Sequence, residues 1–153
     1  MGVLNDEDEV LRAFGESAPV HVVWFSSARK LAEGFYLDGE EIFYAHDGNT
    51  EKVINVNDLN LLGRHNYENV MAATAMSVNF GVPMEKIVEV LKRFQAVEHR
   101  IEYVTEKRGV RFYNDSKGTN PDAAIQGIRA MNRPTLLIGG GYDKQPTYDE
   151  WID

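Results

Sequence analysis

The hydrophobic and polar positions of the first sixty residues follow the period of β-strands. The run "HVVWFS" at 21–26 is short, apolar and rich in β-branched and aromatic residues, which is typical of a strand. From 34 to 56, apolar and polar residues alternate. Asp-Gly pairs at 38–39 and 47–48 interrupt this alternation, and such pairs favour tight hairpin turns. These positions therefore predict a strand followed by a β meander.

The period then lengthens to that of helices. Apolar residues recur at three- and four-residue spacing over 65–82, and Gly81 is placed as a helix stop. Pro83 opens a second helical stretch, "MEKIVEVLKRF" at 84–94, so the two form an αα-hairpin. The acidic stretch Asn5–Glu9, before "VLRAF", favours a short helix near the start because carboxylates complement the helix dipole.

Strand signals return after residue 100. "IEYVTE" and "VRFYND" flank "KRG", which predicts a β-hairpin with Gly109 at its turn. Asn120 and Pro121 then have the residue types of an N-cap and a first helical position. The apolar run "TLLIGGG" at 135–141 reads as another strand, and "YDEWID" at 148–153 as the beginning of a helix.

The order strand, helix, strand after Val110 predicts a βαβ unit with a parallel strand pair. The fold class is therefore α/β. The change of pattern at Gln95–His99 predicts the junction between two subregions.

Polar residues gather in "NDSKGTNPDA" at 114–123, at the carboxyl end of a predicted strand. Ligands of open α/β sheets bind at such ends, and the following helix N-terminus attracts negative charge. Lys117, together with Lys144 after the next predicted strand, would complete a site for a carboxylate or phosphate. The alternative is an ordinary solvated loop, which is the more frequent outcome for Lys144 taken alone.

Two further stretches have a structural and a functional interpretation. Asn66, in "GRHN", is a candidate helix N-cap. His99 and Arg100, in "EHR" at the predicted junction, are either solvated linker residues or part of a ligand cleft. An arginine in such a cleft could bind a phosphate with two parallel hydrogen bonds.

Composition narrows the function classes. With 43% hydrophobic residues the chain can build a core, and its net charge of −8 argues against a nucleic-acid partner. The absence of cysteine removes disulfides and thiolate metal sites, and the four histidines lack metal-ligand spacing, so we expect no metal site in this chain. No apolar run is long enough to span a membrane and the start has no signal-peptide pattern, so we expect no membrane partner and a cytoplasmic location. The oligomeric state is not predicted.

Four motifs occur in the order "LLGRHNYENVMAA", "EHRIEYV", "GVRFYNDSKGTNP" and "LLIGGGYDK". With them the chain resembles the Mur ligases of bacterial cell-wall synthesis, and "NDSKGTNP" is most similar to the branch that adds D-glutamate. The resemblance implies that residues 1–98 are the tail of a central ATPase domain, built from the β meander and the αα-hairpin. Residues 99–153 would begin a Rossmann-like, parallel-sheet domain that binds the amino acid.

The resemblance also implies a reaction. ATP, with Mg²⁺, would phosphorylate the carboxylate of UDP-N-acetylmuramoyl-L-alanine, and the amine of D-glutamate would attack the acyl phosphate. The product is a peptidoglycan precursor, which links the family to cell shape and division. Three nucleotide-binding roles follow from the resemblance, namely adenine at Asn66, phosphates at Arg100 and ribose at Asp115. Lys117, Thr119 and Lys144 would bind the carboxylates of D-glutamate, and Lys117 and His99 would be the catalytic residues.

The chain also departs from the family pattern. It contains no GxxxxGK[ST] phosphate loop, and the family's carbamylated lysine and Mg²⁺ ligands are absent. We therefore expect an internal fragment that is inactive by itself. Two alternatives stay open: an ATP-dependent amide ligase for another amino acid, and a non-catalytic module that binds a nucleotide or carboxylate.

Overall fold

The computed structural model describes residues 1–141 and divides the chain into two compact units. The first unit is Met1–Phe94 and the second begins at Gln95. The predicted helix at 148–153 and the loop bearing Lys144 lie outside the described residues.

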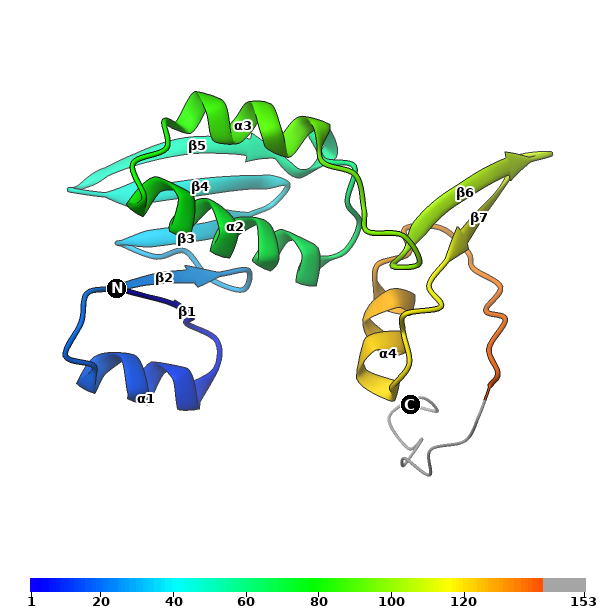
Figure 1. The fold of residues 1–153 in the computed structure, drawn as a ribbon, viewed down its shortest axis with the longest axis horizontal. Coiled ribbons are helices and arrows are strands. Elements are labelled where there is room, and N and C mark those ends of the chain that lie inside the picture. Colours follow the sequence, from blue (N-terminus) through cyan, green and yellow to red (C-terminus); the bar gives the residue numbers. More distant parts are fainter. Residues whose placement is uncertain (142–153) are drawn as a thin grey trace. The chain divides into compact units, whose positions relative to one another are not determined.

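The first unit is built on one five-stranded sheet with the strand order β1-β2-β3-β4-β5 (Figure 1). Strand β2 pairs in parallel with both β1 and β3, whereas β3, β4 and β5 pair antiparallel. The strands are β1 (Gly2–Asn5), β2 (Val22–Ser26), β3 (Gly34–Asp38), β4 (Glu41–His46) and β5 (Asn49–Asn55). The predicted strand and meander are confirmed, and β1 is a strand that the pattern did not predict.

Local backbone chemistry explains the turn between β4 and β5. Asp47 and Gly48 both have positive φ, 51° and 73°, and they form the two-residue loop between the paired residues His46 and Asn49. This is the conformation that tight hairpins require, and Asp-Gly adopts it at low cost.

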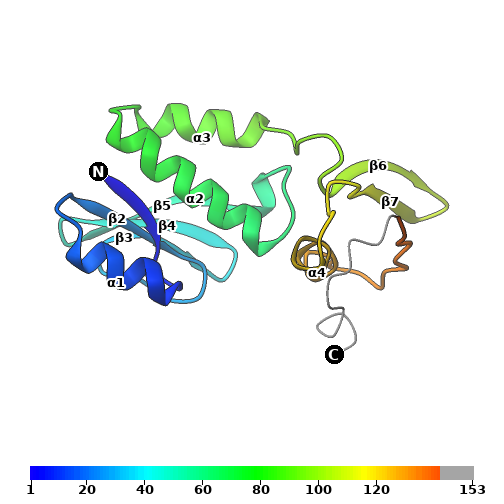
Figure 2. The ribbon, with the colours of Figure 1, turned by 60° about the horizontal axis from the view of Figure 1, so that its bottom comes forward.

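Helices cover both faces of this sheet (Figure 2). Helix α1 (Glu9–Ser17) lies against Trp24 of β2. Helices α2 (Arg64–Asn79) and α3 (Met84–Arg93) cover the opposite face, which carries Val23 and Phe25. A 3-10 helix, η1 (Val56–Asp58), precedes them. The predicted αα-hairpin is confirmed.

Gly81 ends α2 as predicted. Its φ is 81°, its N–H donates to the carbonyl of Val78 at 2.9 Å, and the N–H of Val82 donates to Ser77 at 3.0 Å. These two bonds form a Schellman motif, in which a glycine satisfies the last carbonyls of a helix.

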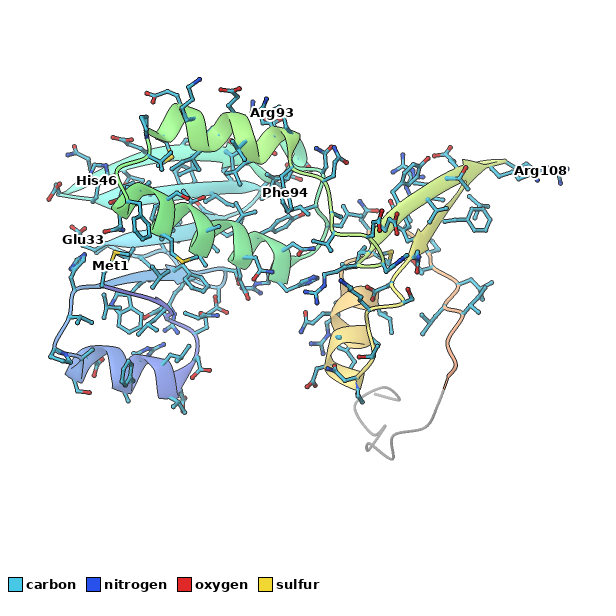
Figure 3. The ribbon with its side chains drawn as sticks, viewed as in Figure 1. Met1, Glu33, His46, Arg93, Phe94 and Arg108 are labelled. Carbon is cyan, nitrogen blue, oxygen red and sulfur yellow. The ribbon has the colours of Figure 1, made fainter. Side chains whose placement is uncertain are left out.

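The second unit contains an antiparallel hairpin, β6 (Glu102–Lys107) and β7 (Val110–Asn114), and helix α4 (Pro121–Arg129). Arg108, with Gly109, forms the tip of the hairpin (Figure 3). Asn120 caps α4, because its Oδ1 accepts the N–H of Ala123 at 2.8 Å. The predicted hairpin and capped helix are confirmed.

The predicted strand at 135–141 is wrong in this structure, and so is its parallel pairing with β7. Residues 133–141 have no regular structure, and Leu136 and Ile138 are 88% and 90% exposed. A parallel strand is stabilised when both of its faces are buried, but the sheet of this unit, within residues 95–141, is only the β6–β7 pair. The parallel pairs of the α/β fold lie instead between β1, β2 and β3.

Candidate functional site

The polar loop between β7 and α4 is folded by its own backbone. The N–H of Gly118 donates to the carbonyl of Asp115 at 2.8 Å, and that of Thr119 to the carbonyl of Lys117 at 2.9 Å. Asn114 closes the start of the loop, because its Oδ1 accepts the N–H of Ser116 at 3.1 Å. The side chains of Lys117 and Thr119 are exposed at the N-terminal end of α4. Both are therefore placed where an anion can reach them.

Asp115 connects this loop to the segment before β6. Its Oδ1 accepts the N–H of Ile101 at 3.0 Å. Its Oδ2 faces α4 so closely that a Cβ added at Gly127 would be 2.6 Å away. The carboxylate is half-buried and already accepts a hydrogen bond from the protein.

His99 and Arg100 form the turn that Asp115 contacts. The N–H of Arg100 donates to the carbonyl of Val97 at 3.0 Å, and the carbonyl of His99 accepts the N–H of Lys117 at 2.9 Å. The His99 N–H donates to Oε2 of Glu102 at 2.8 Å. The structure thus brings together four of the predicted site residues, His99 and Arg100 before β6 and Asp115 and Lys117 after β7, at the open end of the hairpin.

The ring of His99 has a defined partner. Its Nδ1 lies 2.9 Å from Nδ2 of Asn114 and 3.5 Å from Oε2 of Glu102. If the amide donates, Nδ1 is the acceptor and the neutral ring carries its proton on Nε2.

Asn66 lies in the first unit, within the first turn of α2. The N-cap of α2 is Gly63, with φ 94°, so the N-cap interpretation of Asn66 is wrong. The residue is buried, and its Nδ2 donates to the carbonyl of Leu62 at 2.6 Å. Glycine can adopt the positive φ at this helix start, which leaves the asparagine free to bind the preceding loop. The adenine contact of Asn66 stays a prediction.

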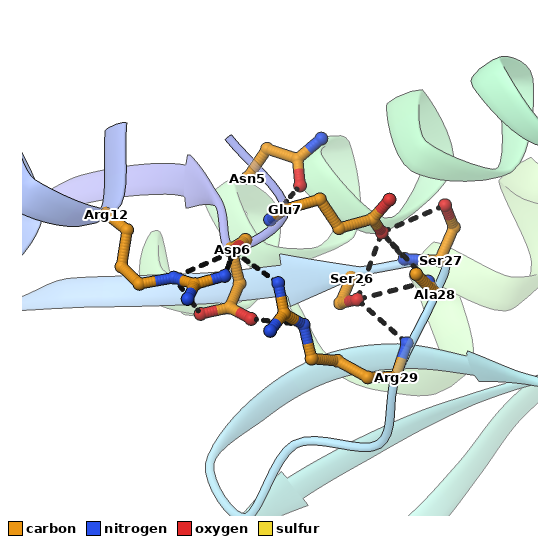
Figure 4. Close-up of polar contacts among 8 residues, drawn as sticks. All are labelled: Asn5, Asp6, Glu7, Arg12, Ser26, Ser27, Ala28 and Arg29. Atoms are coloured by element: carbon orange, nitrogen blue, oxygen red, sulfur yellow. Dashed lines mark hydrogen bonds and ion pairs between the residues drawn. The ribbon is translucent and has the colours of Figure 1, made fainter. Parts of the chain in front are cut away.

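A second polar cluster, at the carboxyl ends of β1 and β2, was not predicted (Figure 4). Oε1 of Glu7 accepts hydrogen bonds from the hydroxyls of Ser26 and Ser27, at 3.0 and 3.1 Å, and from two backbone amides. Burial raises the pKa of Glu7, but these bonds favour the ionised carboxylate more strongly, so its pKa lies below the ordinary 4.5.

Neighbouring charges extend the cluster. Oδ2 of Asp6 lies 3.0 Å from Nε of Arg29, and its Oδ1 lies 3.5 Å from Nε of Arg12. Oγ of Ser27 accepts from Nε of Arg64 at 2.7 Å and also lies beside Oε1 of Glu68, so its single proton is shared between the Glu7 and Glu68 carboxylates. The sequence "NDED" gave the helix-start signal for α1, but the partners at 26–29 are too far along the chain for a local pattern to reveal them.

Two features are absent from residues 1–141. Within residues 1–141, no group of three or more histidine and carboxylate side chains is arranged to hold a metal ion. No helix in this part of the chain is long and apolar enough to cross a membrane.

Comparison with known proteins gives two results from sequence. No protein-family model matches the chain. Over 150 residues, 98% of the chain, it is 54% identical to the UDP-N-acetylmuramoylalanine–D-glutamate ligase of Lachnoclostridium phytofermentans and 55% identical to that of Lachnospira eligens. The chain spans about one third of the length of these curated relatives.

Solved structures with the same fold are also ligases. The UDP-N-acetylmuramoylalanyl-D-glutamyl-2,6-diaminopimelate–D-alanyl-D-alanyl ligase of Acinetobacter baumannii matches 85% of the chain, and 30% of that chain, with a TM-score of 0.61 and 21% identity. A pseudomurein peptide ligase type C from Methanothermus fervidus matches 84%, and 33% of that chain, with a TM-score of 0.56 and 17% identity. These two likenesses show the fold.

Proposed function

The chain is a homologue of the Mur ligases over nearly its whole length, and on this basis we propose that it works as part of an ATP-dependent ligase. The ligase adds D-glutamate to UDP-N-acetylmuramoyl-L-alanine, through an acyl phosphate, in cytoplasmic synthesis of peptidoglycan precursors. The meeting of His99, Arg100, Asp115 and Lys117 in one unit supports the proposal. A nucleotide and an amino acid both need such a combination of cationic and carboxylate groups.

The proposed nucleotide contacts use groups of opposite charge. Arg100 neutralises phosphate oxygens and can form two parallel hydrogen bonds to them. Asp115 accepts hydrogen bonds from the ribose hydroxyls, since its carboxylate has more acceptor positions than the single bond from Ile101 occupies. Asn66 would provide the adenine contact.

Two of the three proposed amino-acid contacts, Lys117 and Thr119, lie on the loop before α4. Lys117, Thr119 and Lys144 bind the two carboxylates of D-glutamate, and the positive end of α4 adds to their attraction. Lys117 and His99 then act near the reacting amine: the lysine orients the substrate, and His99 lines the cleft beside it. Mg²⁺ would accompany ATP, but residues 1–141, which the structure describes, do not form a site for it, so no step is assigned to the ion.

The 153-residue polypeptide alone is expected to be inactive, because phosphoryl transfer needs a phosphate-binding loop and this sequence has none. A chimera tests the proposal. In it, this chain replaces the homologous third of the Lachnoclostridium phytofermentans ligase. We expect release of inorganic phosphate that depends on D-glutamate, ATP and UDP-N-acetylmuramoyl-L-alanine. Phosphate release with a different amino acid would instead assign the chain to another ligase of the superfamily.

Lys117→Ala in this chimera tests the amino-acid site. A charge-assisted contact contributes about 1.5–3 kcal/mol, so kcat/KM for D-glutamate should fall about tenfold to a hundredfold. The melting temperature should change little, because the lysine is exposed. Lys107→Ala, at the end of β6, is the matched control and should leave the kinetics unchanged. Unchanged kinetics in Lys117→Ala would make this lysine an ordinary solvated residue.

A further inference from the structure

The turn before β6 holds two residues in an unfavourable backbone conformation. His99 has φ 67° and Ile101 has φ 47°. Positive φ is disfavoured for residues with a Cβ, and most strongly for β-branched ones such as isoleucine. The side chain of Ile101 is only 6% exposed, so burial helps to keep it there. Strain of this kind persists only when surrounding contacts determine the conformation.

Two carboxylates provide those contacts. The N–H of Ile101 donates to Oδ1 of Asp115 at 3.0 Å, and the N–H of His99 donates to Oε2 of Glu102 at 2.8 Å. Each strained residue therefore has its amide bound to a different acid. A third bond, from the Lys117 N–H to the carbonyl of His99 at 2.9 Å, attaches the same turn to the loop before α4.

Arg100 is the residue between the two strained positions, and its side chain is exposed. We infer that Glu102 and Asp115 are positioning residues, which fix the turn His99–Ile101 and thereby the direction of the Arg100 guanidinium. This inference rests on the proposed function, in which Arg100 contacts the phosphates of ATP. It assigns a role to Glu102, which no proposed contact uses, and gives Asp115 a role besides its ribose contact.

The arrangement also couples two parts of the nucleotide. Oδ1 of Asp115 holds the amide next to Arg100, and its Oδ2 lies close to Gly127 of α4. A ribose hydroxyl that binds this carboxylate therefore binds the group that holds the turn. Ribose recognition and phosphate recognition then share one carboxylate, and their effects on ATP binding are not additive.

Glu102→Ala in the active chimera tests the inference without changing a proposed substrate contact. We expect the KM for ATP to rise about tenfold or more, because misplacing a contact group by a small distance has effects of that size. The KM for D-glutamate should change less than twofold. Glu102→Gln keeps an acceptor oxygen and should restore most of the loss. Glu106→Ala, on the same strand, is the matched control.

A double variant distinguishes the positioning of Arg100 from a general loss of order in the turn. If Glu102 acts through Arg100, adding Glu102→Ala to Arg100→Ala should raise the KM for ATP no further. Equal rises in both KM values, or fully additive effects of the two substitutions, would overturn the inference.

Amide exchange of the 153-residue chain gives a result even if the chimera lacks D-glutamate-dependent activity. The Ile101 and Lys117 amides should exchange slowly, and Asp115→Ala should make the Ile101 amide exchange at least tenfold faster, since it removes the acceptor. Asp115→Asn retains an acceptor oxygen and should keep most of the protection. Unchanged exchange in Asp115→Ala overturns the inference, whereas an inactive chimera with the expected exchange overturns only the proposed function.

Discussion

Thr74 has one of the most deeply buried side chains in the described part of the chain. It lies in the middle of α2 with 1% exposure, and its Oγ1 has no hydrogen-bond partner within residues 1–141. Valine has nearly the same shape and a similar helix propensity. Thr74→Val should therefore raise the free energy of unfolding by about 1–3 kcal/mol, measured by urea denaturation. Thr50→Val, on an exposed position of β5, is the control, and a loss of stability in Thr74→Val would show that the hydroxyl is bound after all.

Glu7 gives a pH dependence at a single residue. Its pKa is lowered in the folded chain, so the stability that it contributes is present above 4.5 and is lost as pH falls through the folded-state pKa. Glu7→Gln keeps the acceptor oxygen but removes the charge. The variant should be less stable than the wild type at pH 7, and the difference should shrink steadily below pH 4.5. Urea midpoints across this range measure it, with exposed Glu16→Gln as control; a constant difference would contradict the assignment.

At the scale of elements, α1 and β2 approach each other over a glycine. A Cβ at Gly15 would lie 2.3 Å from Cη2 and 2.6 Å from Cζ2 of Trp24. Helix propensity alone predicts that Gly15→Ala stabilises α1 by about 1 kcal/mol. We expect the opposite, a loss of about 1–3 kcal/mol, because the ring must move.

Trp24→Phe supplies the test of that explanation. The smaller ring removes the two nearest atoms that the new methyl group would meet, and the third, Cδ1 of Leu4 at 3.0 Å, is a flexible side-chain end. Gly15→Ala should therefore be neutral or stabilising in the Trp24→Phe background. Thermal melts of the four proteins form a double-mutant cycle. Equal effects of Gly15→Ala in both backgrounds would exclude the clash.

The elements that sequence predicted well are those with strong local signals. Asn120 with Pro121 marks the start of α4, Gly81 the end of α2, and the Asp-Gly pair at 47–48 a hairpin turn. The apolar run at 135–141 predicted a strand that does not form. An apolar pattern shows that a strand could be buried, but it does not show whether a sheet is present to cover it.

In the candidate site, too, the sequence reveals local features and does not reveal contacts between distant residues. The loop with Asp115 and Lys117 is evident from its residue types in one short stretch. The bond from Ile101 to Asp115 joins residues fourteen positions apart, and the Glu7 cluster joins residues about twenty apart. Such contacts depend on strand pairing and on backbone conformation, which the order of polar residues does not determine.

At the scale of the whole chain, the hydrophobic core is unevenly shared. Of the seventeen buried hydrophobic side chains in residues 1–141, only Ile101 and Ile125 lie beyond Phe94. The first unit has the parallel and antiparallel sheet, with helices on both faces. Free energy of folding depends mainly on buried apolar area, so most of the stability should belong to residues 1–94.

Truncation to residues 1–94 tests this distribution. The shortened chain should keep a cooperative thermal transition, followed by far-UV circular dichroism, with a midpoint within a few degrees of that of the 153-residue chain, because its core is retained. Ile42→Ala, at a fully buried position of β4, should cost about 2–5 kcal/mol and lower that midpoint in both lengths of chain. Ile125→Ala, made in the 153-residue chain, should leave the same transition in place, since its side chain belongs to the second unit. A non-cooperative melt of residues 1–94, or a main transition that Ile125→Ala shifts as strongly as Ile42→Ala, would show that the two units fold as one.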